Sequence, residues 1–277
     1  MRHENGRRTF SRAIGSLAFV ATLLAGSCAG GLRARVQPPS VHGKPYLRLS
    51  GRVEGFNVWV VDGRYVRENL DEEFTNFGEH FEFPFIPASE FWLDEENSPG
   101  EERFFVDHLL LEWRLMARGS DYDSALEQAD KAEKSERLDT PAAREGNSLL
   151  AGHRIQDLVA RVHKEVLEDW GTGVKVWVVD GELVRDVLFI DFTEGGHDKV
   201  YDFIPSGEVW IDDDVRPEER RFILLHELHE RGLMSAGWTY ARAHKDSSRL
   251  EFHYRHHPGG LDAAIRAEIL KNRRPET

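Results

Sequence analysis

The side chains best suited to chemistry are concentrated in one short run, from His226 to Glu230, which reads His-Glu-Leu-His-Glu. The surrounding segment, Phe222 to Met234, is apolar on nearly every side if it is helical, so we expect a helix that is central to its domain. Ionisable side chains in such a helix cost several kcal/mol unless they are paired or bind a metal ion. The run is therefore the first candidate for a functional site.

Helical geometry groups two of these residues as potential metal ligands. Residues four apart share a face of a helix, so His226 and Glu230 point the same way, while Glu227 lies about 100° further round. A catalytic zinc ion takes three protein ligands and keeps one position for water, and histidine and carboxylate both suit it. We predict that His226 and Glu230 bind zinc and that Glu227 acts as the general base.

The third ligand is expected from the next helix, from about Tyr240 to Tyr254. One face of that helix carries Tyr240, His244, Ser247 and Glu251. His244 is the predicted third ligand, and Glu251 is a reserve ligand or an acceptor that orients a metal-bound histidine. His229 and Tyr240 are further candidates for these supporting roles. In the polar loop from Asp191, His197 or Asp198 could line the site, although a turn is the favoured interpretation.

The segment around His226 resembles the catalytic helix of the zincin metallopeptidases. In that family a His-Glu-x-x-His helix supplies two zinc ligands and a base. Here Glu230 stands at the position of the second histidine, and the resemblance covers this one helix. It implies a zinc-dependent hydrolase that acts on a peptide or protein substrate.

The chain also contains a duplication, which provides an internal control. Gly55–Glu133 matches Gly173–Glu251 at 32 of 79 positions, 118 residues apart. Four candidate residues have identical counterparts in the first copy, namely His226 (His108), Glu230 (Glu112), Tyr240 (Tyr122) and Glu251 (Glu133). Three others are replaced there by leucine, namely Glu227 (Leu109), His229 (Leu111) and His244 (Leu126). Residues kept in both copies are candidates for folding, and those confined to one copy are candidates for chemistry.

Two interpretations of this comparison stay open. In the first, the first repeat has lost its base and its third ligand, and the second repeat uses zinc to activate water. In the second, His226 and Glu230 form a buried hydrogen-bonded pair in both repeats, because buried polar groups need partners.

The remaining pattern predicts an α+β fold of two tandem homologous domains, each a small antiparallel β-sheet packed against two helices. Asp62-Gly63 and Asp180-Gly181 follow apolar strands and indicate β-hairpin turns. Gly119 and Gly237 are expected to end the first long helix of each repeat. A further amphipathic helix is expected where apolar residues recur at helical spacing, namely Ile155, Leu158, Val159, Val162, Val166 and Trp170.

The domain boundaries follow from the repeat and from the composition. Residues 47–134 form the first repeat domain with a degenerate site, and residues 150–277 form the second with the candidate metal site. Residues 135–149, which include Pro141 and Gly146, are expected to be a linker. Residues 28–46 have the composition of a tether.

The N-terminus has the features of an export signal. Residues 1–27 contain several arginines followed by an apolar run that is too short to span a membrane comfortably, as in a removed signal peptide. Gly6 to Arg12 resembles a twin-arginine signal, and Ala25-Gly26-Ser27-Cys28 resembles a bacterial lipobox. The resemblance implies that Cys28 is lipidated and anchors the protein in the cell envelope, on the periplasmic or extracellular face. Cleavage that leaves Cys28 unmodified is the alternative.

Composition excludes several classes of function. Cys28 is the only cysteine, so no intramolecular disulfide and no cysteine-based zinc site can form. The formal net charge of −13 argues against a nucleic acid partner. The hypothesis that competes with a hydrolase is a non-catalytic envelope lipoprotein whose duplicated domains bind a protein or scaffold a complex.

Overall fold

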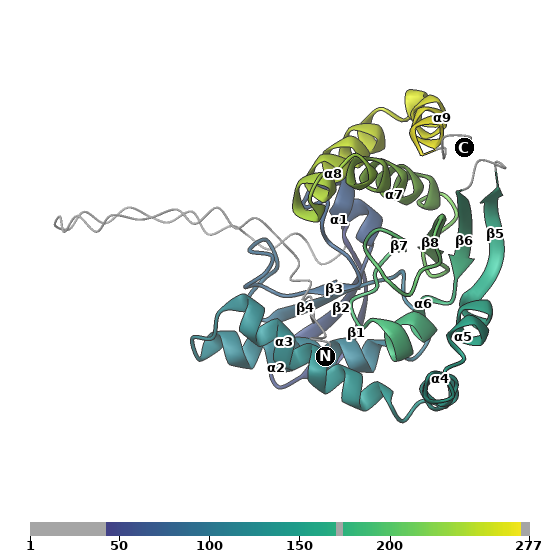
Figure 1. The fold of residues 1–277 in the computed structure, drawn as a ribbon. Helices are drawn as coiled ribbons and strands as arrows, with labels where there is room; N and C mark the ends of the chain where they lie inside the picture. The colour runs from purple at the N-terminus through teal and green to yellow at the C-terminus, as the bar shows by residue number, and fades with distance from the viewer. Residues whose placement is uncertain (1–42, 170–173, 273–277) are drawn as a thin grey trace. The chain divides into compact units, whose positions relative to one another are not determined.

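Each repeat builds the same four-stranded sheet in the computed structural model, which describes residues 43–169 and 174–272 (Figure 1). The first sheet has the order β1-β2-β4-β3, with β1 Tyr46–Val53, β2 Phe56–Val61, β3 Phe77–Gly78 and β4 Glu90–Asp94. The second has the order β5-β6-β8-β7, with β5 His163–Asp169, β6 Lys175–Val179, β7 Gly195–His197 and β8 Glu208–Asp212. The predicted α+β class with two sheet-and-helix units is confirmed.

The sheets are mixed, whereas antiparallel sheets were expected. β2 and β4 run parallel with Trp59 opposite Trp92, and β6 and β8 repeat this with Trp177 opposite Trp210. The other strand pairs are antiparallel. Parallel neighbours need a long crossover connection, and the chain between β2 and β4 provides one that contains α1 (Gly63–Asn69) and β3.

The two Asp-Gly pairs begin helices, so the predicted hairpin turns are wrong at these positions. Asp62 caps α1 by accepting a hydrogen bond from the Tyr65 N–H. Aspartate is as well suited to a helix N-cap as to a turn, which explains the error. The hairpin lies one strand earlier, between β1 and β2, where Glu54 and Gly55 have φ of +46° and +94°.

The glycines of these pairs are required by close packing. A Cβ atom on Gly63 would lie 1.8 Å from an Asp94 oxygen, and one on Gly181 would lie 2.1 Å from Asp212. Asp180 caps the short helix α6 (Gly181–Leu183), which continues into a π-helical turn, η1 (Val184–Leu188). The same steric requirement therefore recurs 118 residues apart.

Two long helices follow each sheet at the predicted places. These are α2 (Glu102–Ala117) and α3 (Tyr122–Arg137) in the first repeat, and α7 (Arg220–Ser235) and α8 (Tyr240–His256) in the second. Gly119 and Gly237 separate the members of each pair with φ of +97° and +92°, as expected for glycines that end helices. After η2 (Pro258–Gly260), a last helix, α9 (Leu261–Lys271), packs against α7.

The segment expected to be a linker is largely helical. α3 continues to Arg137, and α4 (Pro141–Ala151) begins after Thr140, whose hydroxyl accepts a hydrogen bond from the Ala143 N–H. Proline suits the first turn of a helix, so Pro141 starts this helix and does not mark a loop.

The predicted amphipathic helix is shorter than expected. α5 (Ile155–Val162) ends where β5 begins, and Val166 lies in that strand, because pairing with β6 takes over from helix formation. Trp170 lies outside the described residues.

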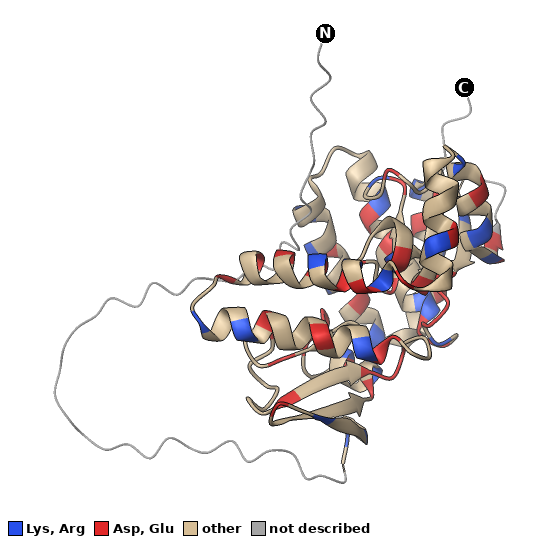
Figure 2. Ribbon diagram, turned by 90° about the horizontal axis from the view of Figure 1, so that it is seen from below, with Lys and Arg blue, Asp and Glu red and all other residues tan. Residues whose placement is uncertain are grey.

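Apolar residues cover both faces of each sheet. Buried ion pairs, such as that of Arg185 with Glu101, join the two repeats. Val58 and Leu93 pack against α2, while Val61 and Trp92 belong to the cluster on the opposite face. The second repeat has the corresponding two clusters. Both repeats belong to one compact unit. Acidic and basic residues are interspersed along the helices (Figure 2).

The predicted signal peptide, Cys28 and nearly all of the tether lie outside the described residues. Within residues 43–169 and 174–272, none of the helices has both the length and the apolar composition needed to cross a membrane.

Candidate metal centre

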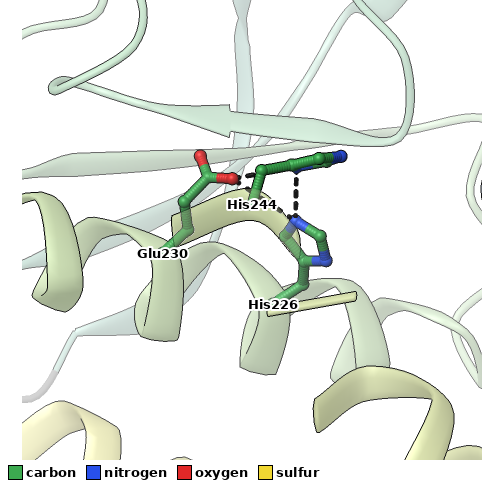
Figure 3. A group of neighbouring side chains, drawn as sticks. All are labelled: His226, Glu230 and His244. Carbon is green, nitrogen blue, oxygen red and sulfur yellow. Dashed lines mark hydrogen bonds and ion pairs between the residues drawn. The ribbon is translucent and has the colours of Figure 1, made fainter. Parts of the chain in front are cut away.

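The three predicted zinc ligands converge on one point. His226 and Glu230 extend from α7 and His244 from α8 (Figure 3). His226 Nε2 lies 3.2 Å from His244 Nδ1 and 3.6 Å from Glu230 Oε2, and His244 Nδ1 lies 2.9 Å from the same oxygen. A triangle with these sides has its corners about 1.9 Å from a common centre, and zinc binds such atoms at about 2.0–2.2 Å. An ion slightly above the plane of the three atoms would meet all of them.

In both histidines, the ring nitrogen that faces away from the three converging atoms, here called the outer nitrogen, contacts a carboxylate. His226 Nδ1 lies 2.9 Å from Glu251, which in turn accepts a 2.8 Å hydrogen bond from Arg255 Nε. His244 Nε2 lies 3.1 Å from Glu73, a residue of the first repeat. Metal-bound histidines are usually oriented in this way, with the second ring nitrogen donating to an acceptor. Glu251 thus contacts His226, as the predicted orienting acceptor would, and Glu73, which sequence reasoning missed, makes the same kind of contact with His244.

Charge at this point favours a cation. Burial opposes protonation of both histidines, but hydrogen bonds with Glu230 and Glu251 hold the pKa of His226 well above 6.5, and those with Glu230 and Glu73 raise the pKa of His244 to about 9. Burial also opposes ionisation of Glu230, yet its histidine neighbours hold its pKa well below 4.5. The carboxylates therefore stabilise positive charge here, whether it is carried by protons or by a metal ion.

Glu227, the predicted base, lies close to one of the three predicted ligands, Glu230. One of its carboxylate oxygens is within 4.8 Å of ligand atoms of Glu230 and His197. Burial and then the charge of Glu230 raise its pKa to about 8. Gly195 lies next to it, where a Cβ atom would lie 2.9 Å from the Trp210 carbonyl oxygen and 3.3 Å from Glu227 Cγ.

His197 contacts Glu230 and, with Glu227 and Glu230, forms a second group of potential ligand atoms within 4.8 Å of one another. It lies in β7, so the loop expected as a turn supplies an edge strand. The Lys199 N–H donates to its Nδ1 at 3.1 Å, so the ring proton must be on Nε2, which lies 3.0 Å from Glu230 Oε1. Burial lowers the pKa of His197 and keeps the ring neutral. Asp198 pairs with Arg231.

His229 lies apart from the three converging atoms. Its ring nitrogens lie 3.1 Å from Asp246 on α8 and 3.0 Å from Glu268 on α9, so it joins three helices. The helix at the corresponding position of the first repeat is α4, which packs instead against α5 and η1.

Tyr240 supports the site through its ring. The ring stacks on His244 with centroids 5.3 Å apart and planes at 25°. It therefore restricts the orientation of the third ligand.

The first repeat contains the structural pair alone. His108 Nδ1 lies 2.8 Å from Glu133 and Nε2 lies 3.4 Å from Glu112, as in the second repeat, but Leu126 stands where His244 would be. The first repeat therefore fits the interpretation of a buried hydrogen-bonded pair, and the second repeat differs from it by the addition of His244. Comparison with protein-family models, curated proteins and solved structures gave no match to this chain.

The three consecutive aspartates from Asp212 to Asp214 belong to a network of ion pairs. Arg185 Nη1 lies 2.5 Å from Asp212, and Nη2 lies 3.1 Å from Asp214. Lys164 lies 2.5 Å from Asp213. Each of these acids therefore has a basic side chain as a partner.

Proposed function

We propose that the protein is a zinc-dependent hydrolase with its metal held by His226, Glu230 and His244. The observation that supports this most is the convergence of three ligand atoms on a point at zinc-binding distance, with both outer histidine nitrogens held by carboxylates. Two histidines and one glutamate form a donor set found in catalytic zinc sites. Bound zinc would lower the pKa of a water molecule in its open position and polarise a carbonyl group.

The chain's own residues then have distinct roles. Glu227 accepts the proton of the attacking water, because its carboxyl group lies close to the ligand Glu230 but is not one of the three converging groups. His197 orients Glu230, and Glu251 orients His226. The resemblance of the helix to zincins makes a peptide or protein the proposed substrate.

The proposed location is the cell envelope, with a lipid on Cys28. The support comes from the lipobox-like run that ends at this cysteine. Cell fractionation tests it: the Cys28→Ser variant should leave the membrane fraction. A variant that stayed membrane-bound would contradict lipid anchoring.

Metal analysis tests the site directly. The chain from Cys28 onward, incubated with zinc and then desalted, should hold one zinc ion per chain by mass spectrometry. His226→Ala and His244→Ala should lose it. His108→Ala is the matched control, because it removes the equivalent histidine of the first repeat, and it should keep the metal. No stoichiometric zinc in the wild type would refute the proposal.

Catalysis needs a separate test. Wild-type protein should cleave members of a fluorogenic peptide library, and Glu227→Gln should bind zinc normally but lose activity by a factor of about 100 or more. Removal of zinc by a chelator should abolish cleavage, and added zinc should restore it. Zinc binding without any hydrolysis would make the metal structural and would favour the protein-binding hypothesis.

A further inference from the structure

The first repeat lacks a base and a third ligand, yet one of its side chains lies at the metal centre. Glu73 belongs to the turn after α1, and its Oε2 lies 3.1 Å from Nε2 of His244, 171 positions further along the chain. Helix α1 packs against α8, which brings the two together. The hydroxyl of Ser248, one turn further along α8, donates to the backbone carbonyl oxygen of His244 at 3.0 Å. We propose, on the basis of the zinc site proposed above, that the first repeat is a positioning element for the metal centre of the second.

The chemistry of the contact defines what Glu73 does. A carboxylate accepts hydrogen bonds and cannot donate them, so His244 must carry a proton on Nε2. The other nitrogen, Nδ1, faces Glu230 and His226, so it donates to Glu230 in the metal-free structure and would give up that proton to bind a metal ion, while Glu73 retains the proton on Nε2. Without Glu73, a neutral ring would keep its one proton on Nδ1, where it faces Glu230. Glu73 is thus a positioning residue that selects the metal-binding tautomer of His244.

A second route connects the first repeat to His226. Arg67 of α1 lies 3.8 Å from Glu219, which is hydrogen-bonded to Arg255. Arg255 donates to Glu251, and Glu251 holds Nδ1 of His226. All members of this chain are buried. Both metal-binding histidines are therefore oriented by groups that the first repeat contacts.

Zinc affinity of the full chain from Cys28 onward provides the test. Competition with a chromophoric chelator should show Glu73→Ala binding zinc 10- to 100-fold more weakly than the wild type. Glu73→Gln should fall between the two, because its amide oxygen still accepts a hydrogen bond but carries no charge. Glu72→Ala, which removes the neighbouring glutamate, is the control and should bind as the wild type does.

A spectroscopic measurement separates tautomer selection from a general loss of structure. In the long-range proton–nitrogen NMR spectrum of the zinc-bound wild type, His244 should carry a slowly exchanging proton on Nε2. In Glu73→Ala this proton should exchange rapidly, while the signals of His108 in the first repeat stay unchanged.

The outcomes distinguish this inference from the proposed function. A wild type that binds zinc, with Glu73→Ala and Glu73→Gln equally tight, would overturn the role of Glu73 and leave the zinc site standing. A wild type without zinc would overturn the site itself. Glu73 is about one-third exposed, so both variants are expected to fold, and circular dichroism checks this.

Discussion

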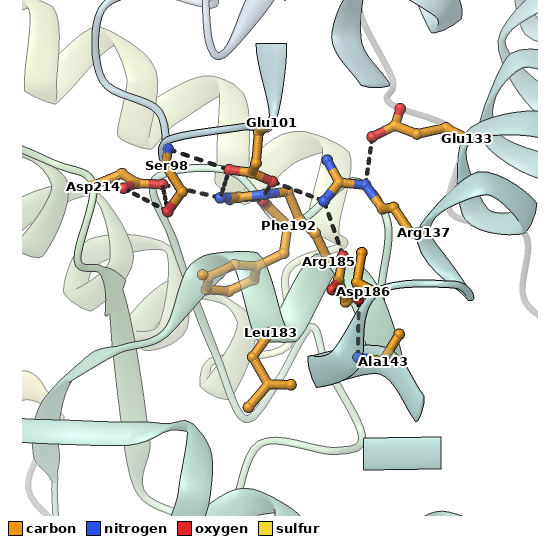
Figure 4. Close-up of polar contacts among 12 residues, drawn as sticks. Ser98, Glu101, Glu133, Arg137, Ala143, Leu183, Arg185, Asp186, Phe192 and Asp214 are labelled. Carbon is orange, nitrogen blue, oxygen red and sulfur yellow. Dashed lines mark hydrogen bonds and ion pairs between the residues drawn. The ribbon is translucent and has the colours of Figure 1, made fainter. Parts of the chain in front are cut away.

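Arg185 of the second repeat makes a two-pronged ion pair with Glu101 of the first. Nε lies 2.8 Å from Oε1 and Nη2 lies 2.6 Å from Oε2, with both side chains buried (Figure 4). Glu101 also accepts a hydrogen bond from Arg137. Arg137 in turn donates to Glu133, which lies 2.8 Å from Nδ1 of His108. The equivalent chain toward His226 begins at Arg67 of the first repeat and runs through Glu219, Arg255 and Glu251. Each repeat therefore supports the buried histidine of the other through an Arg-Glu-Arg-Glu chain.

Breaking this pair should strongly destabilise the protein. Arg185→Met should lower the free energy of unfolding by about 3–5 kcal/mol, because it leaves buried carboxylates without their cation. Urea denaturation followed by circular dichroism measures this. Lys131→Ala is the control, since it removes an exposed partner of Glu127, and it should cause no measurable change. A similarly small effect of Arg185→Met would contradict a stabilising role for the network.

Restoring the third ligand in the first repeat should create a second metal site. Leu126→His places an imidazole opposite His108 and Glu112, as His244 lies opposite His226 and Glu230. Zinc content should rise from one to two ions per chain, with Leu126→Ala unchanged at one. A count that stays at one in Leu126→His would show that the first repeat has lost more than this ligand.

His229 should contribute to stability and not to metal binding. His229→Ala removes the partner of Asp246 and Glu268, and Glu268 is buried. We expect the free energy of unfolding to fall by about 1–3 kcal/mol and the zinc content to remain at the wild-type level. Loss of zinc from this variant would mean that His229 reaches the metal centre.

The first repeat should lose stability at alkaline pH through His108. Burial opposes its protonation, but hydrogen bonds with Glu112 and Glu133 outweigh burial and raise its pKa to about 10, against 6.5 as the ordinary value. A raised pKa stabilises the fold fully below about pH 6.5, and this stabilisation disappears as the pH rises toward 10.

The difference in unfolding free energy between zinc-free wild type and His108→Leu measures this contribution. It should shrink by about 4 kcal/mol between pH 6 and pH 10, since each pKa unit corresponds to about 1.4 kcal/mol. His226 is present in both proteins, so its own titration cancels. A difference that did not depend on pH would show that His108 is neutral in the folded protein.

The Asp-Gly pair of the second repeat should not tolerate alanine. Gly181→Ala would place a Cβ atom 2.1 Å from Asp212, which must then move from Arg185. We expect a loss of about 1–3 kcal/mol or more, measured as a lower midpoint of thermal unfolding. Gly51→Ala is the control, because space around that Cβ position is open. Equal midpoints would contradict the packing argument.

Features that depend on local periodicity could be predicted from the sequence. The spacing of four placed His226 and Glu230 on one face of α7, and the 118-residue repeat predicted two similar units with helices that end at Gly119 and Gly237. Local signals failed where one motif suits two structures. Asp-Gly favours both a hairpin turn and a capped helix, and the packing of Gly63 against Asp94 decides between them.

The sequence by itself thus determined the duplication, the helix that carries the candidate ligands and the residues confined to the second copy. Only the tertiary structure decided that His229 joins α8 and α9 while His244 joins His226, and that Glu73 of the other repeat contacts His244. The physical reason is the separation of the contacting residues along the chain. Side chains a few positions apart are placed by backbone geometry, but a contact across 171 positions forms only when two sheets and their helices pack together.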